Sequence, residues 1–417
     1  QKTNGRGLIS ERPFPQKTSS AWRHPVKLPL GYRYATTYAG IRKQKSDDIA
    51  LIVPDSPASA AAVFTKNVVQ AAPVHLSKQH LRASRGKVSA ILVNAGNANC
   101  ATRTGEKVAL ASCKAVAKAL RTKTETVLPA STGVIGVELD PHLLTSAVPK
   151  LVEQLSPDHF ERAARAILTT DTRMKIASEE VRLERGVVRI AGMTKGSGMI
   201  HPNMATTLGF VMTDAAIAPK HLKEMLLRTT ESSYNSLSVD GDMSTNDTIA
   251  LLANGASGIR PTEKERTVFE EVLSWVMESL AEQIAADGEG ARKLIIIRTV
   301  GFKTTEDARR VARAIANSPL VKTAIAGSDA NWGRILAAAG YSGVHFDPSK
   351  VDVHLQQQLV CRGGLAARFD ETALKQKLDE LEVRIRVTLN GGGKGEARFF
   401  TCDLTEGYIQ INGSYRT

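Results

Sequence analysis

A loop of small residues that leads into a strand, near the middle of the chain, constrains the fold more than any other segment. Residues 195–210 read KGSGMIHPNMATTLGF. The glycines can adopt backbone conformations that other residues avoid, and the Pro-Asn pair favours a turn. After Thr206 the apolar residues alternate as in a strand, at Leu208, Phe210 and Met212. Thr206 is therefore predicted to lie where a tight loop meets a strand.

A threonine at such a junction can serve chemistry or merely begin a strand. Its hydroxyl is a useful nucleophile only beside a base, and the residue's own α-amine is one such base once the preceding peptide bond is cut. A cut between Ala205 and Thr206 would release that amine, whose ordinary pKa of about 7.7–8.0 leaves a neutral fraction near pH 8. Nothing in composition or spacing proves such a cut, and the residues alone favour an ordinary entry from a loop into a strand.

Strand-like and helix-like segments alternate along the 417 residues, which predicts an α/β class of layered sheets and helices organised in two or three lobes. Apolar runs predict strands at 87–93, 127–136, 187–193 and 294–297. Apolar faces or helix-forming residues predict helices at 109–120, 159–170, 219–232 and 266–285. A loop is expected at 94–104, and segments 383–387 and 397–405 are expected to pair as a hairpin around NGGGKGE.

The net charge of +13 is concentrated at the amino end, where residues 1–45 carry ten basic side chains and one acidic one. Such a segment is similar to an organelle-targeting leader and equally to a solvated disordered arm, so residues 1–27 are assigned to one of these. With aromatic residues at only 5%, a basic nucleic-acid-binding protein is the weaker alternative. No apolar run reaches the length of a membrane span.

Metal and cofactor motifs are weak in this sequence. Its four cysteines show no CxxC pair and no histidine at zinc-finger spacing, and they are expected to be reduced, mostly buried thiols. The glycine-rich runs match neither a Walker loop nor a GxGxxG fingerprint. We expect no metal and no cofactor.

Many motifs resemble the ornithine acetyltransferase family, the glutamate N-acetyltransferases of arginine biosynthesis. They follow the family's order from about residue 28 to 417: GYRYATTYAGIRK, NAGNANCATRTG, STGVIG, TTDT, the KGSGMI to NMATT run, DGDMSTNDT, DGEGARK, GSDANWGRI and INGSYRT. The resemblance implies a self-cleaving, amino-terminal-nucleophile-like fold with central sheets flanked by helices. It also implies an alpha chain of residues 28–205, a beta chain of residues 206–417, and assembly of two of each.

The resemblance implies that acetyl passes from N2-acetyl-L-ornithine to L-glutamate through an acetyl-Thr206 ester, after cleavage behind Ala205. Acetyl-CoA as a second donor is left open. Thr132 and Gly133 would form the oxyanion hole, where a donor is worth on the order of a hundredfold to a thousandfold in rate. The implied substrate contacts are Thr169, Lys195, Thr206, Glu289, Asn412 and Thr417, and Thr170 is not separated from Thr169.

The sequence also allows an alternative enzymatic function and gives expectations about binding partners and cellular location. An amino-terminal-nucleophile aminopeptidase of related fold is the nearer alternative, although KGSGMI and INGSYRT favour the transferase. Nucleic acid and membrane partners are not expected. Because eukaryotic family members are organellar and fungal ones mitochondrial, the basic amino end favours a fungal-type member in the mitochondrial matrix.

Overall fold

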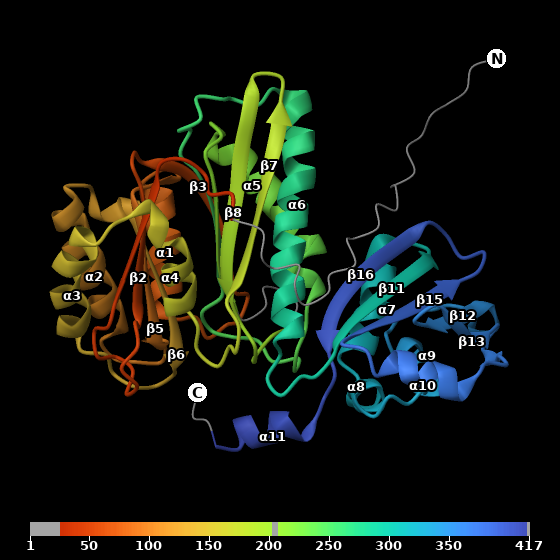
Figure 1. The fold of residues 1–417 in the computed structure, drawn as a ribbon. Helices are drawn as coiled ribbons and strands as arrows, with labels where there is room; N and C mark the ends of the chain where they lie inside the picture. Colours follow the sequence, from red (N-terminus) through yellow and green to blue (C-terminus); the bar gives the residue numbers. More distant parts are fainter. Residues whose placement is uncertain (1–25, 202–206, 415–417) are drawn as a thin grey trace, which may run out of the picture.

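A computed structural model describes residues 26–201 and 207–414, and within these ranges the strands form three sheets (Figure 1). The predicted fold class, α/β with layered sheets and helices, is confirmed. In the described parts of the chain, no helix is both long enough and apolar enough to cross a membrane.

The first sheet has four strands, and its last two run parallel. Its order is β1 (Tyr32–Thr37), β2 (Ile49–Pro54), β5 (Ala90–Asn97) and β6 (Val127–Val134). Because β5 and β6 are parallel, their carboxyl ends share one edge of the sheet, where Ala95 pairs with Thr132 and Gly96 with Gly133. The expected loop at 94–104 therefore begins later than predicted, since residues 94–97 continue β5.

The second sheet combines strands from both sides of the predicted cleavage point. Its order is β4 (Lys87–Val88), β3 (Ala58–Phe64), β10 (Thr248–Ala253), β9 (Leu208–Thr213), β8 (Gly186–Lys195) and β7 (Lys175–Leu183). Strands β8 and β9 pair antiparallel from Ile190 and Thr213 to Lys195 and Leu208. Every residue of β9 is buried, so this strand lies in the middle of the protein.

Helices cover the outer faces of these two sheets. On the first sheet they are α2 (Gly105–Leu120) and α3 (Pro141–Glu153), and on the second α5 (Pro219–Ser232) and α6 (Glu263–Ala286). A capping box between Thr262 and Glu265 fixes the start of α6. The inner faces of the sheets bury a common core to which α4 (Phe160–Ala166) contributes, while α1 (Ala72–Ala83) packs on β6 and α2.

The third sheet and its helices form the lobe at the right of Figure 1. The sheet order is β14 (Leu365–Ala366), β13 (Gln358–Arg362), β12 (Val351–Leu355), β15 (Glu382–Leu389), β11 (Leu294–Phe302) and β16 (Gly395–Cys402). The helices that share its core are α7 (Thr305–Ala316), α8 (Pro319–Ala326), α9 (Trp332–Gly340) and α10 (Glu371–Leu378). Helix α11 (Glu406–Asn412) follows and lies at the bottom of Figure 1.

The predicted terminal hairpin is wrong, because β11 lies between β15 and β16. Strand β15 pairs parallel with β11, and β16 pairs with β11 on the other side. The glycine-rich link crosses the end of β11 closely: a Cβ at Gly393 would lie 2.4 Å from the carbonyl oxygen of Phe302. The glycines therefore serve this close crossing rather than a two-strand turn.

Candidate active site

The predicted site is centred on the loop between β8 and β9. Lys195 ends β8 and pairs with Leu208 at the start of β9, so the chain leaves and re-enters the second sheet at one place. Ala205 and Thr206, the predicted cleavage residues, lie outside the described residues, as does Thr417. The surroundings of the junction are described on both sides, at Lys195 and at Thr207.

Thr207 is held on three sides and is 2% exposed. Its hydroxyl donates to the carbonyl oxygen of Lys195 at 2.6 Å and lies 2.8 Å from the hydroxyl of Thr194. Its N–H donates to Oδ1 of Asp247 at 3.0 Å. With its proton already committed to a main-chain carbonyl, the Thr207 hydroxyl serves to close the strand pair.

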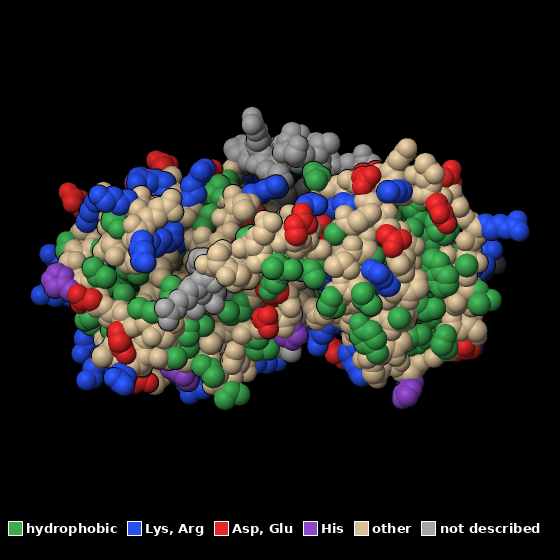
Figure 2. Space-filling view, turned by 90° about the horizontal axis from the view of Figure 1, so that it is seen from below, with side chains coloured by type: hydrophobic (Ala, Val, Ile, Leu, Met, Phe, Trp, Pro, Cys, Tyr) green, Lys and Arg blue, Asp and Glu red, His purple; other side chains and the backbone are tan. Residues whose placement is uncertain are grey.

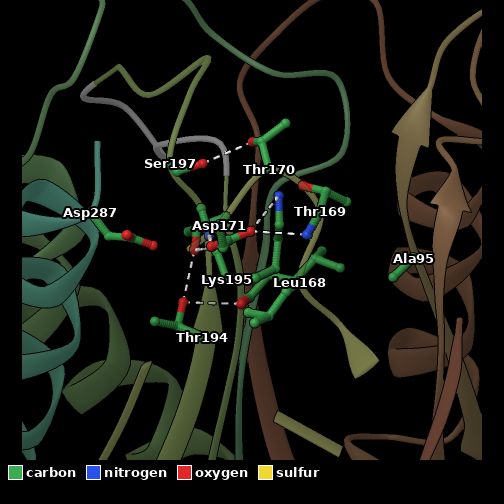
Figure 3. Close-up of polar contacts among 12 residues, drawn as sticks. Ala95, Leu168, Thr169, Thr170, Asp171, Thr194, Lys195, Ser197 and Asp287 are labelled. Atoms are coloured by element: carbon green, nitrogen blue, oxygen red, sulfur yellow. Dashed lines mark hydrogen bonds and ion pairs between the residues drawn. The ribbon is translucent and has the colours of Figure 1, made fainter. Parts of the chain in front are cut away.

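Asp171 is a buried carboxylate that organises the same loop (Figure 3). Its Oδ1 accepts from Nζ of Lys175 at 2.6 Å and from the N–H of Gly196 at 2.7 Å. Its Oδ2 accepts from the N–H of Thr169 at 3.0 Å and lies 3.9 Å from Nζ of Lys195. Burial alone would raise the pKa of Asp171, but Lys195, Lys175 and these hydrogen bonds outweigh it and hold the pKa below its usual range.

Lys175 joins Asp171 to a second buried carboxylate. Its Nζ donates to Oδ2 of Asp287 at 2.6 Å, and Asp287 also accepts from the N–H groups of Thr172 and Arg173. Asp287 is the first residue of the DGEG segment, so Lys175 ties that segment to the TTDT segment. An ion pair buried this completely fixes the relative positions of its parts, because breaking it leaves an uncompensated charge.

Lys195, the predicted anion contact, is 4% exposed. Burial lowers the pKa of its ammonium, and the negative charge of Asp171 opposes that shift. The two threonines of TTDT differ in their contacts: the hydroxyl of Thr170 is 2.8 Å from that of Ser197, whereas Thr169 contacts Asp171 through its main chain.

Thr132 and Gly133 approach this loop from the first sheet. Thr132 is 9% exposed and lines a cavity of about 10 Å³. The other residues around that cavity are Lys195, Thr207, Leu208, Ser244, Asn246 and Asp247. Gly133 has a φ of +129°, and an added Cβ would lie 2.4 Å from the carbonyl carbon of Gly96. Glycine is thus required where β5 and β6 end side by side.

Glu289 and Asn412 meet on the other side of the loop. The amide of Asn412 donates to Oε2 of Glu289 at 2.8 Å, and the N–H of Glu289 donates to the carbonyl oxygen of Ser197 at 2.8 Å. A Cβ at Gly198 would lie 2.3 Å from the Glu289 carboxylate, so the two segments are in close contact. The end of helix α11 therefore contacts Glu289, which in turn contacts the central loop.

The structure brings together the predicted site residues that it describes. Thr132 and Lys195 share one cavity, Thr169 reaches Lys195 through Asp171, and Glu289 joins the loop at Ser197. The residues missed by sequence reasoning are the buried polar ones: Asp171, Lys175, Asn246, Asp247 and Asp287. All but Lys175 stand inside quoted motifs, TTDT, DGDMSTNDT and DGEG, which is the one signal that could have found them.

Comparisons with known proteins cover nearly the whole chain. The pattern of the ArgJ family matches residues 33–417. A Chlorobaculum tepidum protein called arginine biosynthesis bifunctional protein ArgJ is 46% identical over 395 residues, covering 94% of this chain and 97% of its own. A protein of the same name from Caldanaerobacter subterraneus is 45% identical over 400 residues, with 94% and 98% covered.

Two solved structures are also similar to parts of the chain. The crystal structure of a Bacillus halodurans ArgJ protein is 39% identical, with a TM-score of 0.48, and covers 49% of this chain and 98% of its own. The ornithine acetyltransferase of Mycobacterium tuberculosis, solved in complex with ornithine, is 31% identical, with a TM-score of 0.37, and covers 44% and 95%. All four of these proteins are bacterial.

Proposed function

The chain belongs to the ArgJ family of arginine-biosynthesis enzymes, and from this premise we propose that it moves acetyl from N2-acetyl-L-ornithine to L-glutamate, giving L-ornithine and N-acetyl-L-glutamate. Likeness along 94% of the chain to a named ArgJ protein carries the proposal. The gathering of the described site residues around a single loop supports it. One amide is exchanged for a similar amide, so the transfer needs no external energy source.

Thr206 is the proposed nucleophile. The chain cuts itself when the Thr206 hydroxyl attacks the Ala205 carbonyl and water resolves the ester; the freed α-amine then acts as base. In each turnover the hydroxyl attacks the acetyl carbonyl, ornithine leaves with its amine, and the glutamate amine takes the acetyl from the ester. The commitment of the Thr207 hydroxyl to the Lys195 carbonyl supports Thr206 over its neighbour.

The proposed oxyanion hole is the hydroxyl of Thr132 and the N–H of Gly133. A tetrahedral intermediate needs donors fixed in advance, and donors on a buried strand end are held without further ordering. The position of Thr132 on the cavity that Lys195 and Thr207 also line supports this role. A Thr132→Ala variant should keep the fold and slow transfer on the order of a hundredfold or more.

The substrates are zwitterions, so the site needs both signs of charge. Lys195 is proposed to bind a substrate carboxylate, with Thr169, Asn412 and Thr417 as further contacts. Glu289 is proposed to bind the side-chain ammonium of ornithine. The hydroxyl contact of Thr170 with Ser197 favours Thr169 as the substrate contact of the pair.

The proposed alpha chain, residues 28–205, and beta chain, residues 206–417, would stay associated after cleavage. The antiparallel pairing of β8 with β9 crosses the cut and supports this. Assembly as two alpha and two beta chains, use of acetyl-CoA as a second donor, a basic leader at residues 1–27 and a place in the mitochondrial matrix of a fungal-type organism remain predictions. The relatives described above are bacterial and give the mitochondrial prediction no support.

The proposal is tested by mass analysis together with an acetyl-transfer assay. The denatured protein should give pieces ending at Ala205 and beginning at Thr206, and Thr206→Ala should stay whole and inactive. Thr207→Val is the matched control, since it removes the neighbouring hydroxyl and should still be cut. An intact, fully active wild-type chain, or transfer by Thr206→Ala at the normal rate, would refute the mechanism.

The two alternative functions make different predictions. An aminopeptidase would release amino acids from peptide amides and would not need glutamate as acceptor. A nucleic-acid-binding protein would retain strong, salt-sensitive polyanion binding without its first 45 residues. On the face shown in Figure 2, lysine and arginine side chains are interspersed with aspartate and glutamate, which does not favour polyanion binding there.

A further inference from the structure

Asn246 is a buried asparagine to which the mechanism above gives no role. It stands in the DGDMSTNDT motif just before β10 and is 6% exposed. Its Nδ2 donates to the carbonyl oxygen of Ala98 at 2.6 Å and to that of Ser131 at 2.8 Å. Its Oδ1 accepts from the hydroxyl of Thr245 at 2.6 Å. Because carbonyl oxygens only accept, the NH₂ group must face them, and both of its hydrogens are used.

The two carbonyls lie on either side of the proposed oxyanion donors, the pair at 132–133. The carbonyl of Ser131 belongs to the peptide group whose nitrogen is that of Thr132. Ala98 lies in the loop after β5, and its N–H donates to the carbonyl oxygen of Val134 at 2.9 Å. One side-chain amide therefore fixes β6 directly before the donor pair and, through Ala98, directly after it.

The edge of β6 that this amide holds is the edge that carries the main-chain donor. Among the described strands, β6 is the last of the first sheet and pairs only with β5. The carbonyl oxygen of Pro129 accepts from the hydroxyl of Ser77 at 2.8 Å, on the edge away from β5, and that of Ser131 accepts from Asn246. Main-chain groups of alternate strand residues point to the same edge, so we expect the N–H of Gly133 on this edge too.

Asn246 also connects the donor pair to the second sheet. The donors and both carbonyls belong to the proposed alpha chain, whereas Asn246 belongs to the proposed beta chain. Two residues after Asn246, the N–H of Thr248 donates to the carbonyl oxygen of Thr207 at 3.0 Å, and Thr248 pairs with Leu208 of β9. A short, buried path of hydrogen bonds therefore sets the position of β6 relative to the start of β9.

We propose that Asn246 is the positioning residue of the oxyanion hole: its amide holds the pair of Thr132 and Gly133 at a fixed place relative to β9. The inference deepens the proposed function and rests on it. Asn246 acts through the peptide groups that it holds and not by touching the substrate. Donors stabilise the tetrahedral intermediate because they are fixed before charge develops, so loosening them should slow the chemical step without weakening substrate binding.

The test measures acetyl transfer in Asn246→Ala and Asn246→Asp, with rates given per cut chain as counted by mass spectrometry. Alanine removes the amide, whereas aspartate keeps its size but replaces the NH₂ group by oxygen. Both variants should lose on the order of tenfold to a hundredfold in kcat, since a misplacement of about 1 Å costs up to about a hundredfold. The KM for acetylornithine and the Kd for ornithine, measured by calorimetry, should stay at their wild-type values.

The matched control is Asn254→Ala, at the other end of β10. The Nδ2 of Asn254 donates to the carbonyl oxygens of Leu30 and Gly31, both at 2.8 Å, so this half-buried amide makes the same kind of contact with the proposed alpha chain. It lies away from the donor pair. The control variant should keep the wild-type kcat even if its thermal stability falls.

Hydrogen exchange tests the positioning even in a chain that is not cut. In the uncut Thr206→Ala chain, adding Asn246→Ala should speed amide exchange in peptides from β6, because the strand loses the bonds that hold its end. Adding Asn254→Ala to the same chain should leave exchange in β6 unchanged. This comparison needs neither cleavage nor activity.

Two results would overturn the inference while leaving the proposed function in place. One is a wild-type kcat in the cut Asn246 variants when Thr132→Ala is slow. The other is exchange in β6 that is no faster with Asn246→Ala than with Asn254→Ala. A wild-type rate in Thr132→Ala would instead refute the proposed oxyanion hole, and an uncut but fully active wild-type chain would refute the proposed function itself.

Discussion

Gly133→Ala tests the close contact between the ends of β5 and β6. The added Cβ would lie 2.4 Å and 2.5 Å from the carbonyl carbon and oxygen of Gly96 and 2.7 Å from the nitrogen of Asn97. All three atoms belong to the backbone, so no side chain can rotate away. At a φ of +129°, alanine is strained in addition.

The expected cost adds these two effects. A non-glycine residue in a sparsely populated backbone region costs about 1–3 kcal/mol, and overpacking a buried contact costs about 1–3 kcal/mol more. Gly136→Ala is the matched control: its φ is +77°, but nothing lies within 4 Å of its added Cβ, so only backbone strain of about 1–2 kcal/mol applies. Gly133→Ala should therefore be less stable than Gly136→Ala by about 2 kcal/mol, the middle of the range for overpacking.

Urea unfolding followed by far-ultraviolet circular dichroism measures this difference. With an m-value of about 2–3 kcal/mol/M, 2 kcal/mol separates the two midpoints by roughly 0.7–1 M. Acetyl transfer should also slow on the order of a hundredfold to a thousandfold in Gly133→Ala alone, because the displaced strand end moves the proposed oxyanion donor. Equal midpoints and equal transfer rates in the two variants would show that the contact with Gly96 is not what requires glycine.

Two further predictions concern buried charges. Lys175→Met leaves the carboxylates of Asp171 and Asp287 without their shared ammonium and should lower the free energy of unfolding by about 3–5 kcal/mol. Lys27→Met, which removes an ion pair of half-exposed groups, should cost less than about 1 kcal/mol in the same urea titration; equal losses would contradict the reasoning. Because the folded pKa of Asp247 is raised, its contribution to stability is present below the unfolded value of about 3.9 and is lost as pH rises through the folded value. Asp247→Asn should thus gain on wild type as pH rises above about 4 in thermal unfolding, and a difference that does not change with pH would argue against the raised pKa.

The local features of the fold were predictable from sequence because they depend on short-range periodicity. Helix α5 begins and ends at the predicted residues, Pro219 and Ser232, and the alternation after Thr206 became β9. The hairpin prediction failed because β11, the strand between β15 and β16, comes from a segment far earlier in the chain, Leu294–Phe302. Pairing over such a separation leaves no mark in local periodicity.

The candidate site, too, was predictable from sequence only in part. Glycines and threonines in quoted motifs pointed to the loop and to the strand end at Gly133. Asp171 and Asp247 gave no comparable signal, because an aspartate in a polar loop is ordinarily solvated and only the fold shows that both are buried. Their roles depend on neighbours that the folded chain brings beside them, such as Lys175 for Asp171 and Thr207 for Asp247.

Under the proposed self-cleavage, the pairing of β8 with β9 has a consequence for the order of folding and cutting. A separately made piece starting at Thr206 would present β9 as a bare strand edge, and the other piece would present β8, so each would be prone to aggregate. Synthesis as one polypeptide avoids those exposed edges, because β8 and β9 would pair before the bond between Ala205 and Thr206 is cut. The α-amine of Thr206 would then be released only after the second sheet has formed, so only correctly folded chains would become active.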